Sequence, residues 1–157
     1  MSESENTSVV AITVAVMLAV VMQVLDLTIV NVALTYMRGS LQANSDQITW
    51  VLTSYMIANV ILLPLTGLLV ERYGQRTVML WSVAGFVVAS ALCGQAHSLP
   101  EIVLWRLLQG VFGASLAPVG QTIMLHAYPA RKRGQAMAIL GMGIMLGPIL
   151  GPTLGGW

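Results

Sequence analysis

Hydrophobic positions run along the chain in five long blocks that charged residues hardly interrupt. A bilayer core about 30 Å thick requires roughly 20 apolar residues in a helix, and each block comes close to that length. Stretches such as "SVAGFVVASALCG" are continuously apolar, whereas the strands of a membrane barrel alternate apolar and polar residues. The pattern therefore predicts five membrane-spanning helices, over residues 9–34, 48–70, 78–95, 101–125 and 135–157.

Composition supports a membrane protein, because 57% of the residues are hydrophobic, 8% are charged and the mean hydropathy is +0.82. Ordinary globular chains are about 25% charged, so this chain could hardly cover a water-facing surface. We predict an all-α integral membrane protein in contact with the lipid bilayer. A net charge of +1 without a basic face excludes a nucleic-acid binder. The single cysteine, Cys93, allows no internal disulfide or cysteine zinc site, and we interpret it as a packing residue.

The basic residues predict the orientation of the chain. They concentrate in two loops, between the second and third spans and between the fourth and fifth: Arg72, Arg76, Arg131, Lys132 and Arg133. The positive-inside rule places these loops, and with them the N-terminus, in the cytoplasm. The start, "MSESENTS", has no basic residue, and the apolar run that follows is too long for a secretory signal. The first helix is therefore predicted to be an uncleaved span.

Within the first span, the segment "VMQVLDLTIVNVAL" carries an ionisable carboxylate, Asp26. A charge at mid-membrane costs about 2.5–3.5 kcal/mol on insertion scales and usually marks an ion or substrate path. The side chain is too short to reach the interface, so we favour a proton or cation site over a polar contact between helices. Gln23 shares this face of the helix, and Asn31 lies further round. Asn31 is either a cavity residue or such a polar helix contact.

The fourth span contains "RLLQGVFGA", in which Arg106, Gln109, Gly110 and Gly113 share one helical face. The glycines allow another backbone to approach closely, and Arg106 and Gln109 would then point into that contact. An alternative is that Arg106 extends outward to the interface. Because Arg106 and Asp26 lie at similar depth and are the charges well inside the predicted spans, we expect an electrostatic relation between them.

A third pattern, "GLLVERYGQR", lies at the predicted cytoplasmic end of the second span. Gly74 fits the position just after a helix, where a left-handed backbone favours glycine. Arg72 and Arg76 can donate to carboxylates or to helix-end carbonyls, and Arg72 is alternatively a plain topology anchor. Together with Gly67 and Glu71, these residues are candidates for a cytoplasmic gate.

The fifth span, "GMGIMLGPILGPTLGGW", has glycines four residues apart and two prolines. This spacing is typical of closely packed membrane helices, and each proline removes a backbone hydrogen bond and should bend the helix. We predict tight packing and a kink, with a role in conformational gating as a further hypothesis. The residues concerned are Gly143, Gly147, Pro148, Gly151, Pro152 and Gly155.

Taken together, these segments resemble the major facilitator superfamily, and within it the EmrB/QacA-type drug:proton antiporters with fourteen spans. "LDLTIVNVAL" is similar to the first-helix motif of that subgroup, "GLLVERYGQR" to the loop motif, "RLLQGVFGA" to the fourth-helix motif and "GIMLGPILGPTLGG" to the antiporter motif. Two positions depart from the family pattern. Thr35 stands where the first-helix motif usually has Pro, and Glu71 stands where the loop motif usually has Asp.

The resemblance implies a proton-coupled multidrug efflux transporter of a bacterial inner membrane that works by alternating access. Its substrates would be lipophilic compounds, including cationic ones, and the proton gradient would supply the energy without a cofactor or metal. Asp26 would carry the proton and Arg106 would tune it, with Gln23, Asn31 and Gln109 as substrate or cavity candidates. In a double-membraned bacterium, a periplasmic adaptor and an outer-membrane channel would be further partners.

The family is built from repeated three-helix units, of which five spans make one and two thirds of the next. Residues 1–157 are therefore predicted to be the amino-terminal region of a transporter bundle, whose partner is the rest of the transporter chain. An alternative of another class is a small membrane protein in its own right. It would be an assembly or regulatory subunit held by its glycine faces, with no transport activity. We disfavour an enzyme because the sequence shows no catalytic constellation.

Overall fold

The computed structural model describes residues 3–40 and 44–155, which form six α-helices and one short 3₁₀ helix. The prediction of an all-α membrane protein is confirmed. The elements follow one another with short connections: α1 (Glu3–Ser40), α2 (Ser45–Tyr73), α3 (Gln75–Gln95), α4 (Leu99–Gly113), α5 (Leu116–Ala127), η1 (Ala130–Lys132) and α6 (Arg133–Gly155).

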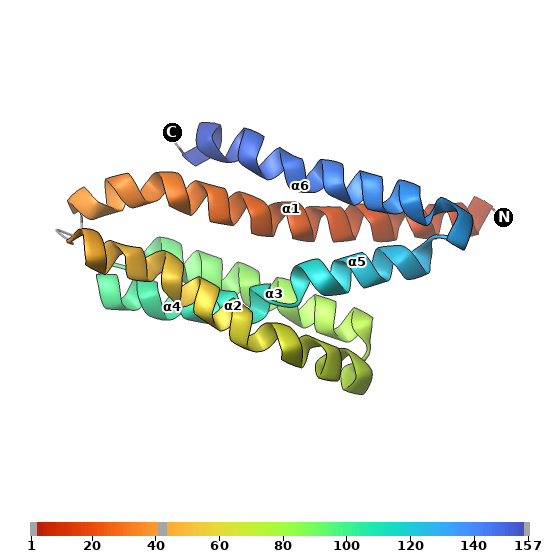
Figure 1. Ribbon diagram of the computed structural model, residues 1–157, viewed down its shortest axis with the longest axis horizontal. Coiled ribbons are helices and arrows are strands. Elements are labelled where there is room, and N and C mark those ends of the chain that lie inside the picture. Colours follow the sequence, from red (N-terminus) through yellow and green to blue (C-terminus); the bar gives the residue numbers. More distant parts are fainter. Residues whose placement is uncertain (1–2, 41–43, 156–157) are drawn as a thin grey trace.

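The helices lie lengthwise beside one another, as a bundle that crosses a membrane requires (Figure 1). α6 lies along α1, and α5 also packs against α1. α2, α3 and α4 form a second group, in which α4 packs against both α2 and α3, and α2 packs against α1. Within the described residues, five stretches are long and apolar enough to span a bilayer, so the predicted number of spans is confirmed. Their bounds are Ser8–Ala33, Asp46–Tyr73, Gln75–Gln95, Leu99–Ala127 and Ala130–Thr153.

The fourth span is interrupted, because α4 ends at Gly113 and α5 begins at Leu116. Pro118 accounts for the interruption, since it lacks an N–H group and its ring crowds the carbonyl four residues earlier, that of Ala114. Backbone hydrogen bonds continue on both sides of the turn, so α5 continues the path of α4 toward the other end of the bundle. The sequence-based prediction did not include this break.

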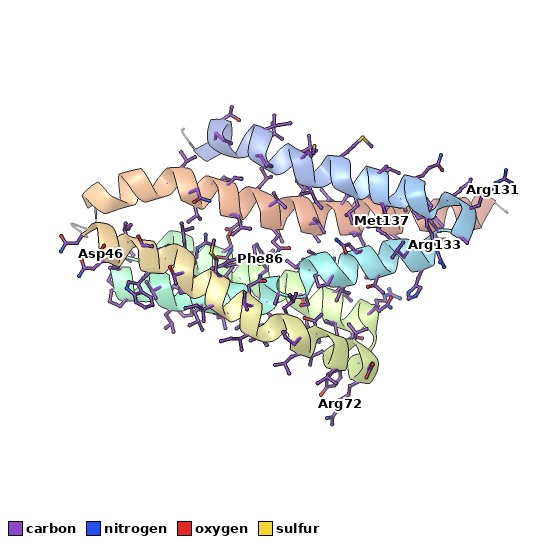
Figure 2. The ribbon with its side chains drawn as sticks, viewed as in Figure 1. Asp46, Arg72, Phe86, Arg131, Arg133 and Met137 are labelled. Carbon is purple, nitrogen blue, oxygen red and sulfur yellow. The ribbon has the colours of Figure 1, made fainter. Side chains whose placement is uncertain are left out.

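Buried apolar side chains fill the space between the two groups of helices, with Phe86 at 0% exposure near the middle (Figure 2). On the outer faces of the bundle the opposite holds. Large apolar side chains such as Trp81 (70% exposed), Met145 (71%) and Leu80 (63%) point away from the protein. Apolar residues on an outer surface are what a lipid environment favours, because hydrocarbon offers no partners to polar groups.

The basic residues of the two predicted cytoplasmic loops lie at one end of the bundle. Figure 2 shows Arg131, Arg133 and Arg72 toward the end at which the chain begins, and Asp46 at the opposite end. Arg133 also stabilises the end of α5, since its Nε donates to the Leu125 carbonyl at 3.1 Å. Cations suit helix C-termini, where backbone carbonyls lack helical partners.

Three of the four glycines predicted to pack closely lie against α1, where a Cβ atom would overlap its side chains. The pairs are Gly143 with Met17, Gly147 with Val24, and Gly151 with Thr28. The surroundings of Gly155 lie outside the described side chains. α6 stays α-helical through Pro148 and Pro152. The Thr28 hydroxyl lies 3.3 Å from the Gly147 carbonyl oxygen, so a polar contact accompanies this close approach.

Candidate functional site

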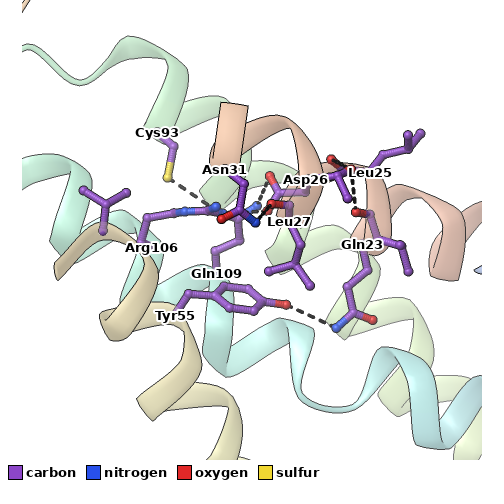
Figure 3. Close-up of polar contacts among 12 residues, drawn as sticks. Gln23, Leu25, Asp26, Leu27, Asn31, Tyr55, Cys93, Arg106 and Gln109 are labelled. Carbon is purple, nitrogen blue, oxygen red and sulfur yellow. Dashed lines mark hydrogen bonds and ion pairs between the residues drawn. The ribbon is translucent and has the colours of Figure 1, made fainter. Parts of the chain in front are cut away.

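Polar side chains from four helices meet inside the apolar bundle (Figure 3). Asp26 comes from α1, Tyr55 from α2, Cys93 from α3, and Arg106 and Gln109 from α4. Gln109 is completely buried and the Arg106 side chain is 1% exposed, whereas the Asp26 side chain is 14% exposed. The carboxylate is thus the accessible member of a buried charged cluster.

Asp26, Arg106 and Gln109 form a closed triangle of hydrogen bonds. Arg106 Nη1 donates to Asp26 Oδ2 at 2.6 Å and to Gln109 Oε1 at 2.6 Å. Gln109 Nε2 donates to Asp26 Oδ1 at 2.9 Å. The two residues that the sequence placed at similar depth are therefore in direct contact, and each oxygen of the carboxylate faces an N–H group.

The rest of the Arg106 guanidinium group has an unusual environment for a buried cation. Its carbon atom lies 5.3 Å from the centre of the Tyr55 ring, a cation–π distance. Within the described chain, Nε and Nη2 have no hydrogen-bond partner. Arg106 is not extended to the membrane interface, which was the alternative interpretation of this residue.

Gln23 lies beside the triangle and joins three helices. Its Nε2 donates to the Gly113 carbonyl at 3.0 Å and to the Tyr55 hydroxyl at 3.2 Å. The Gly113 carbonyl is available because the last carbonyls of a helix lack helical partners. Gln23 Oε1 is buried and has no partner among the described residues. Asn59 lies 3.5 Å from the same hydroxyl, so Tyr55 is the centre of this second polar group.

Asn31 is separate from this cluster. Its side chain is exposed, and its Nδ2 donates to the Leu27 carbonyl of its own helix at 2.8 Å. Two other members of the cluster were missed by the sequence analysis. Tyr55 lies seven residues inside the second span as predicted, which begins at residue 48. That is too deep for an interfacial tyrosine, and the depth was the available signal. Cys93, which we interpreted as a packing residue, has its Sγ 3.7 Å from Gln109 Oε1.

The loop between α2 and α3 depends on Gly74, whose φ of +82° is the left-handed conformation that favours glycine. Its N–H donates to the Val70 carbonyl at 2.9 Å, and α3 begins at the next residue. Glu71 and Arg76 are exposed, and over the described residues neither side chain makes a hydrogen bond or ion pair. Arg72 is also exposed and lies 5.7 Å from the centre of the neighbouring Tyr73 ring.

Gly67 completes this loop segment and has open space beside it, because a Cβ atom there would meet no heavy atom within 4 Å. Over the described residues, the side chains of this segment make no hydrogen bond or ion pair with the Asp26 cluster. In the described chain, no group of three or more His, Cys, Asp or Glu side chains could hold a metal ion.

Comparison with known proteins connects this geometry to a family. Residues 16–157 match the Major Facilitator Superfamily. The chain is 45% identical to Multidrug export protein EmrB of Haemophilus influenzae, over 98% of this chain and 30% of that protein. It is 44% identical to Fatty acid resistance protein FarB of Neisseria gonorrhoeae, over 93% and 29%. The chain thus spans about 30% of the length of these curated relatives.

A solved structure shares the fold. It is the crystal structure of a bacterial homolog to the human lysosomal transporter Spinster, in an inward-facing and unoccupied conformation. The TM-score is 0.85 at 19% sequence identity, and the match covers 99% of this chain and 32% of the other. At 19% identity, this similarity shows a shared fold and nothing about function.

Proposed function

We propose that this chain, which belongs to the Major Facilitator Superfamily, couples proton binding at Asp26 to drug export by alternating access. Family membership confirms the resemblance seen in the sequence and identifies a membrane transporter rather than an enzyme. Multidrug export relatives support lipophilic toxic compounds as the substrate class. Because the chain spans only about 30% of those relatives, export is a property we propose for the full-length protein.

The observation that carries the proposal is the buried ion pair of Asp26 and Arg106. An arginine side chain keeps its proton under all physiological conditions, so within this ion pair a proton can be exchanged only at the Asp26 carboxylate. The carboxylate is also the more exposed partner, at 14% against 1%. The geometry thus supports Asp26 as the proton carrier and Arg106 as the fixed charge beside it.

The energy of this pair is large enough to change a conformation. When Asp26 takes up a proton, Arg106 remains as a buried cation without its counter-charge. Breaking a buried pair in this way costs about 3–5 kcal/mol. Moving a two-state equilibrium from 1:99 to 99:1 requires about 5.5 kcal/mol, so protonation supplies most of what a change in access needs.

A lipophilic cation that enters beside Asp26 would favour the ionised carboxylate and the release of the proton. Drug and proton would then exclude one another, which is the condition for antiport. Asn31, exposed on α1, is our candidate for substrate contact, with Gln23 at the edge of the site. Gln109 is fully buried, so we assign it to the proton site instead of the substrate cavity.

The glycine face of α6 would transmit the change. Val24 and Thr28, the α1 residues against which Gly147 and Gly151 pack, lie on either side of Asp26 in the sequence. A shift of α1 near Asp26 therefore alters the contact with α6 directly. This arrangement supports a gating role for α6 in addition to packing.

We place the protein in the bacterial inner membrane with its N-terminus in the cytoplasm, since the basic residues gather at that end of the bundle. Glu71, Arg72 and Arg76 would then form the cytoplasmic gate through contacts with the rest of the full-length transporter. In a double-membraned bacterium, we expect a periplasmic adaptor and an outer-membrane channel as partners. The energy source is the proton gradient, without a bound cofactor.

The test is proton-driven uptake of ethidium into inverted vesicles that contain the full-length protein. Asp26→Asn keeps the size and polarity of the side chain but cannot ionise, so uptake should be lost. Asp46→Asn is the matched control, because Asp46 is an exposed residue in the first turn of α2 and should be dispensable. Gradient-driven uptake by Asp26→Asn at the wild-type rate would contradict the proposal.

A further inference from the structure

The side-chain amide of Gln109 lies among groups that dictate which way it faces. Arg106 Nη1 can only donate, so the atom 2.6 Å from it must be the amide oxygen. An ionised carboxylate can only accept, so the atom 2.9 Å from Asp26 Oδ1 must be the amide nitrogen. The thiol of Cys93, 3.7 Å from the amide oxygen, agrees with the same orientation.

This orientation fits only the ionised form of Asp26. A protonated carboxyl carries an O–H group that needs an acceptor when it is buried. Within the described residues, the hydrogen-bond partners of Asp26 are both donors, namely Arg106 Nη1 and Gln109 Nε2. The same amide group carries an acceptor, Gln109 Oε1, which faces Asp26 if the amide turns over.

We propose that Gln109 is a proton-dependent switch between Asp26 and Arg106, an inference that rests on the proposed role of Asp26 as proton carrier. One proton from water binds to Asp26 Oδ1, and the amide of Gln109 turns by half a rotation. Its oxygen then accepts the new O–H group, and its nitrogen faces Arg106 and Cys93. When the proton leaves, the amide returns and the triangle closes again.

The switch acts on Arg106, because one N–H group of Nη1 loses its acceptor and the other keeps only an uncharged one. The first then faces the Gln109 nitrogen, and the second donates to Oδ2, now the carbonyl oxygen of a neutral carboxyl, in a weaker hydrogen bond. Nε and Nη2 have no partner in the described chain, so the cation keeps only this weaker bond and the Tyr55 ring beside it. The charged and titratable groups around Gln109 are thus Asp26, Tyr55, Cys93 and Arg106, one from each of four helices. Arg106 is thus held less firmly to Asp26, which frees α4 to move relative to α1.

Two substitutions separate this role from simple packing. Gln109→Leu has neither a donor nor an acceptor, so Asp26 could still bind a proton without signalling to Arg106. Gln109→Glu, when its carboxyl is protonated, again offers one donor and one acceptor. In this variant, the coupling between proton binding at Asp26 and the hydrogen bonds of Arg106 should therefore return as the pH falls. Gln95→Leu is the matched control, since Gln95 is exposed at the end of α3 and, over the described residues, its side chain makes no hydrogen bond to the cluster.

The experiment uses full-length protein and ethidium. It measures ethidium-induced proton release in detergent and gradient-driven uptake in vesicles, both across a range of pH. For Gln109→Leu we expect ethidium-induced proton release to persist, because Asp26 can still bind and lose a proton. Uptake should fall at least tenfold. For Gln109→Glu we expect uptake to recover toward lower pH, whereas Gln95→Leu should behave as wild type.

Uptake by Gln109→Leu at the wild-type rate would overturn the switch while leaving Asp26 as the carrier. If Gln109→Leu does not fold, Gln109→Glu provides the test. Uptake by Gln109→Glu with the pH dependence of wild type would then overturn the switch as well. Proton release from Asp26→Asn equal to that of wild type would overturn both the switch and the proposed function.

Discussion

The Tyr55 hydroxyl packs so closely against the backbone of Gly113 that no side chain fits at position 113 without moving it. A methyl group at Gly113 would lie 2.7 Å from the Tyr55 hydroxyl oxygen and 3.3 Å from the Phe86 ring. Tyr55 is 3% exposed and Phe86 is fully buried, so neither side chain can swing away into lipid. Gly113→Ala must therefore displace the ring that lies beside Arg106.

The magnitudes favour a strong coupling between the two positions. Overpacking by one methyl group costs about 1–3 kcal/mol. Tyr55→Phe removes a hydrogen bond from Gln23 worth about 0.5–1.5 kcal/mol, although Gln23 keeps its bond to the Gly113 carbonyl at 3.0 Å. In the double variant the clashing oxygen is absent, and the nearest ring atom is 3.3 Å away. We expect the double variant to lose about 1–2 kcal/mol less than the sum of the single variants.

The assay is a double-mutant cycle on the free energy of unfolding of the full-length protein, measured by SDS titration in mixed micelles. Gly94→Ala is the control, because its added methyl group meets no heavy atom within 4 Å and should not lower the stability. Single effects that add to within about 0.5 kcal/mol would show that Tyr55 and Gly113 are not coupled, since independent sites behave in that way.

Two further predictions follow from the topology and from the α1–α6 contact. In a cysteine-free background, single cysteines at Arg76 and Gly134 should react with an impermeant reagent only from the cytoplasmic side, and one at His97 only from outside. Reaction at position 76 from outside sealed cells would reverse the orientation. Gly147→Leu should block export because its side chain would enter the space of α1, whereas Met145→Leu, on the exposed face, should have little effect. Full resistance with normal expression of Gly147→Leu would show that close packing there is unnecessary.

The five spans could be predicted because the thickness of the bilayer dictates how long an apolar helix must be. The encounter of Asp26 and Arg106 could be anticipated for a related reason. Charges are so costly in hydrocarbon that two of opposite sign at similar depth are expected near each other. Figure 3 shows them in contact, and Gln109 is hydrogen-bonded to both.

The contacts of Tyr55 could not be predicted, since they depend on which face of α2 turns toward α4. In a soluble helix the polar stripe reveals the outer face, but in lipid both the buried and the outer faces are apolar. Gly110 lies against the Tyr55 backbone and fixes that orientation through a close approach, which only the three-dimensional structure shows. The break before α5 did have a signal, Pro118, within an otherwise continuous apolar run.

In the proposed mechanism Asp26 gains and loses the proton that drives export, and proton release from the purified full-length protein measures this step itself. Ethidium is added to the protein in weakly buffered detergent solution while the pH is recorded. Wild type should release protons, and Asp26→Asn should bind ethidium without releasing any. An Asp26→Asn protein that releases protons as wild type does would show that Asp26 is only a polar contact between helices and that the carrier lies elsewhere.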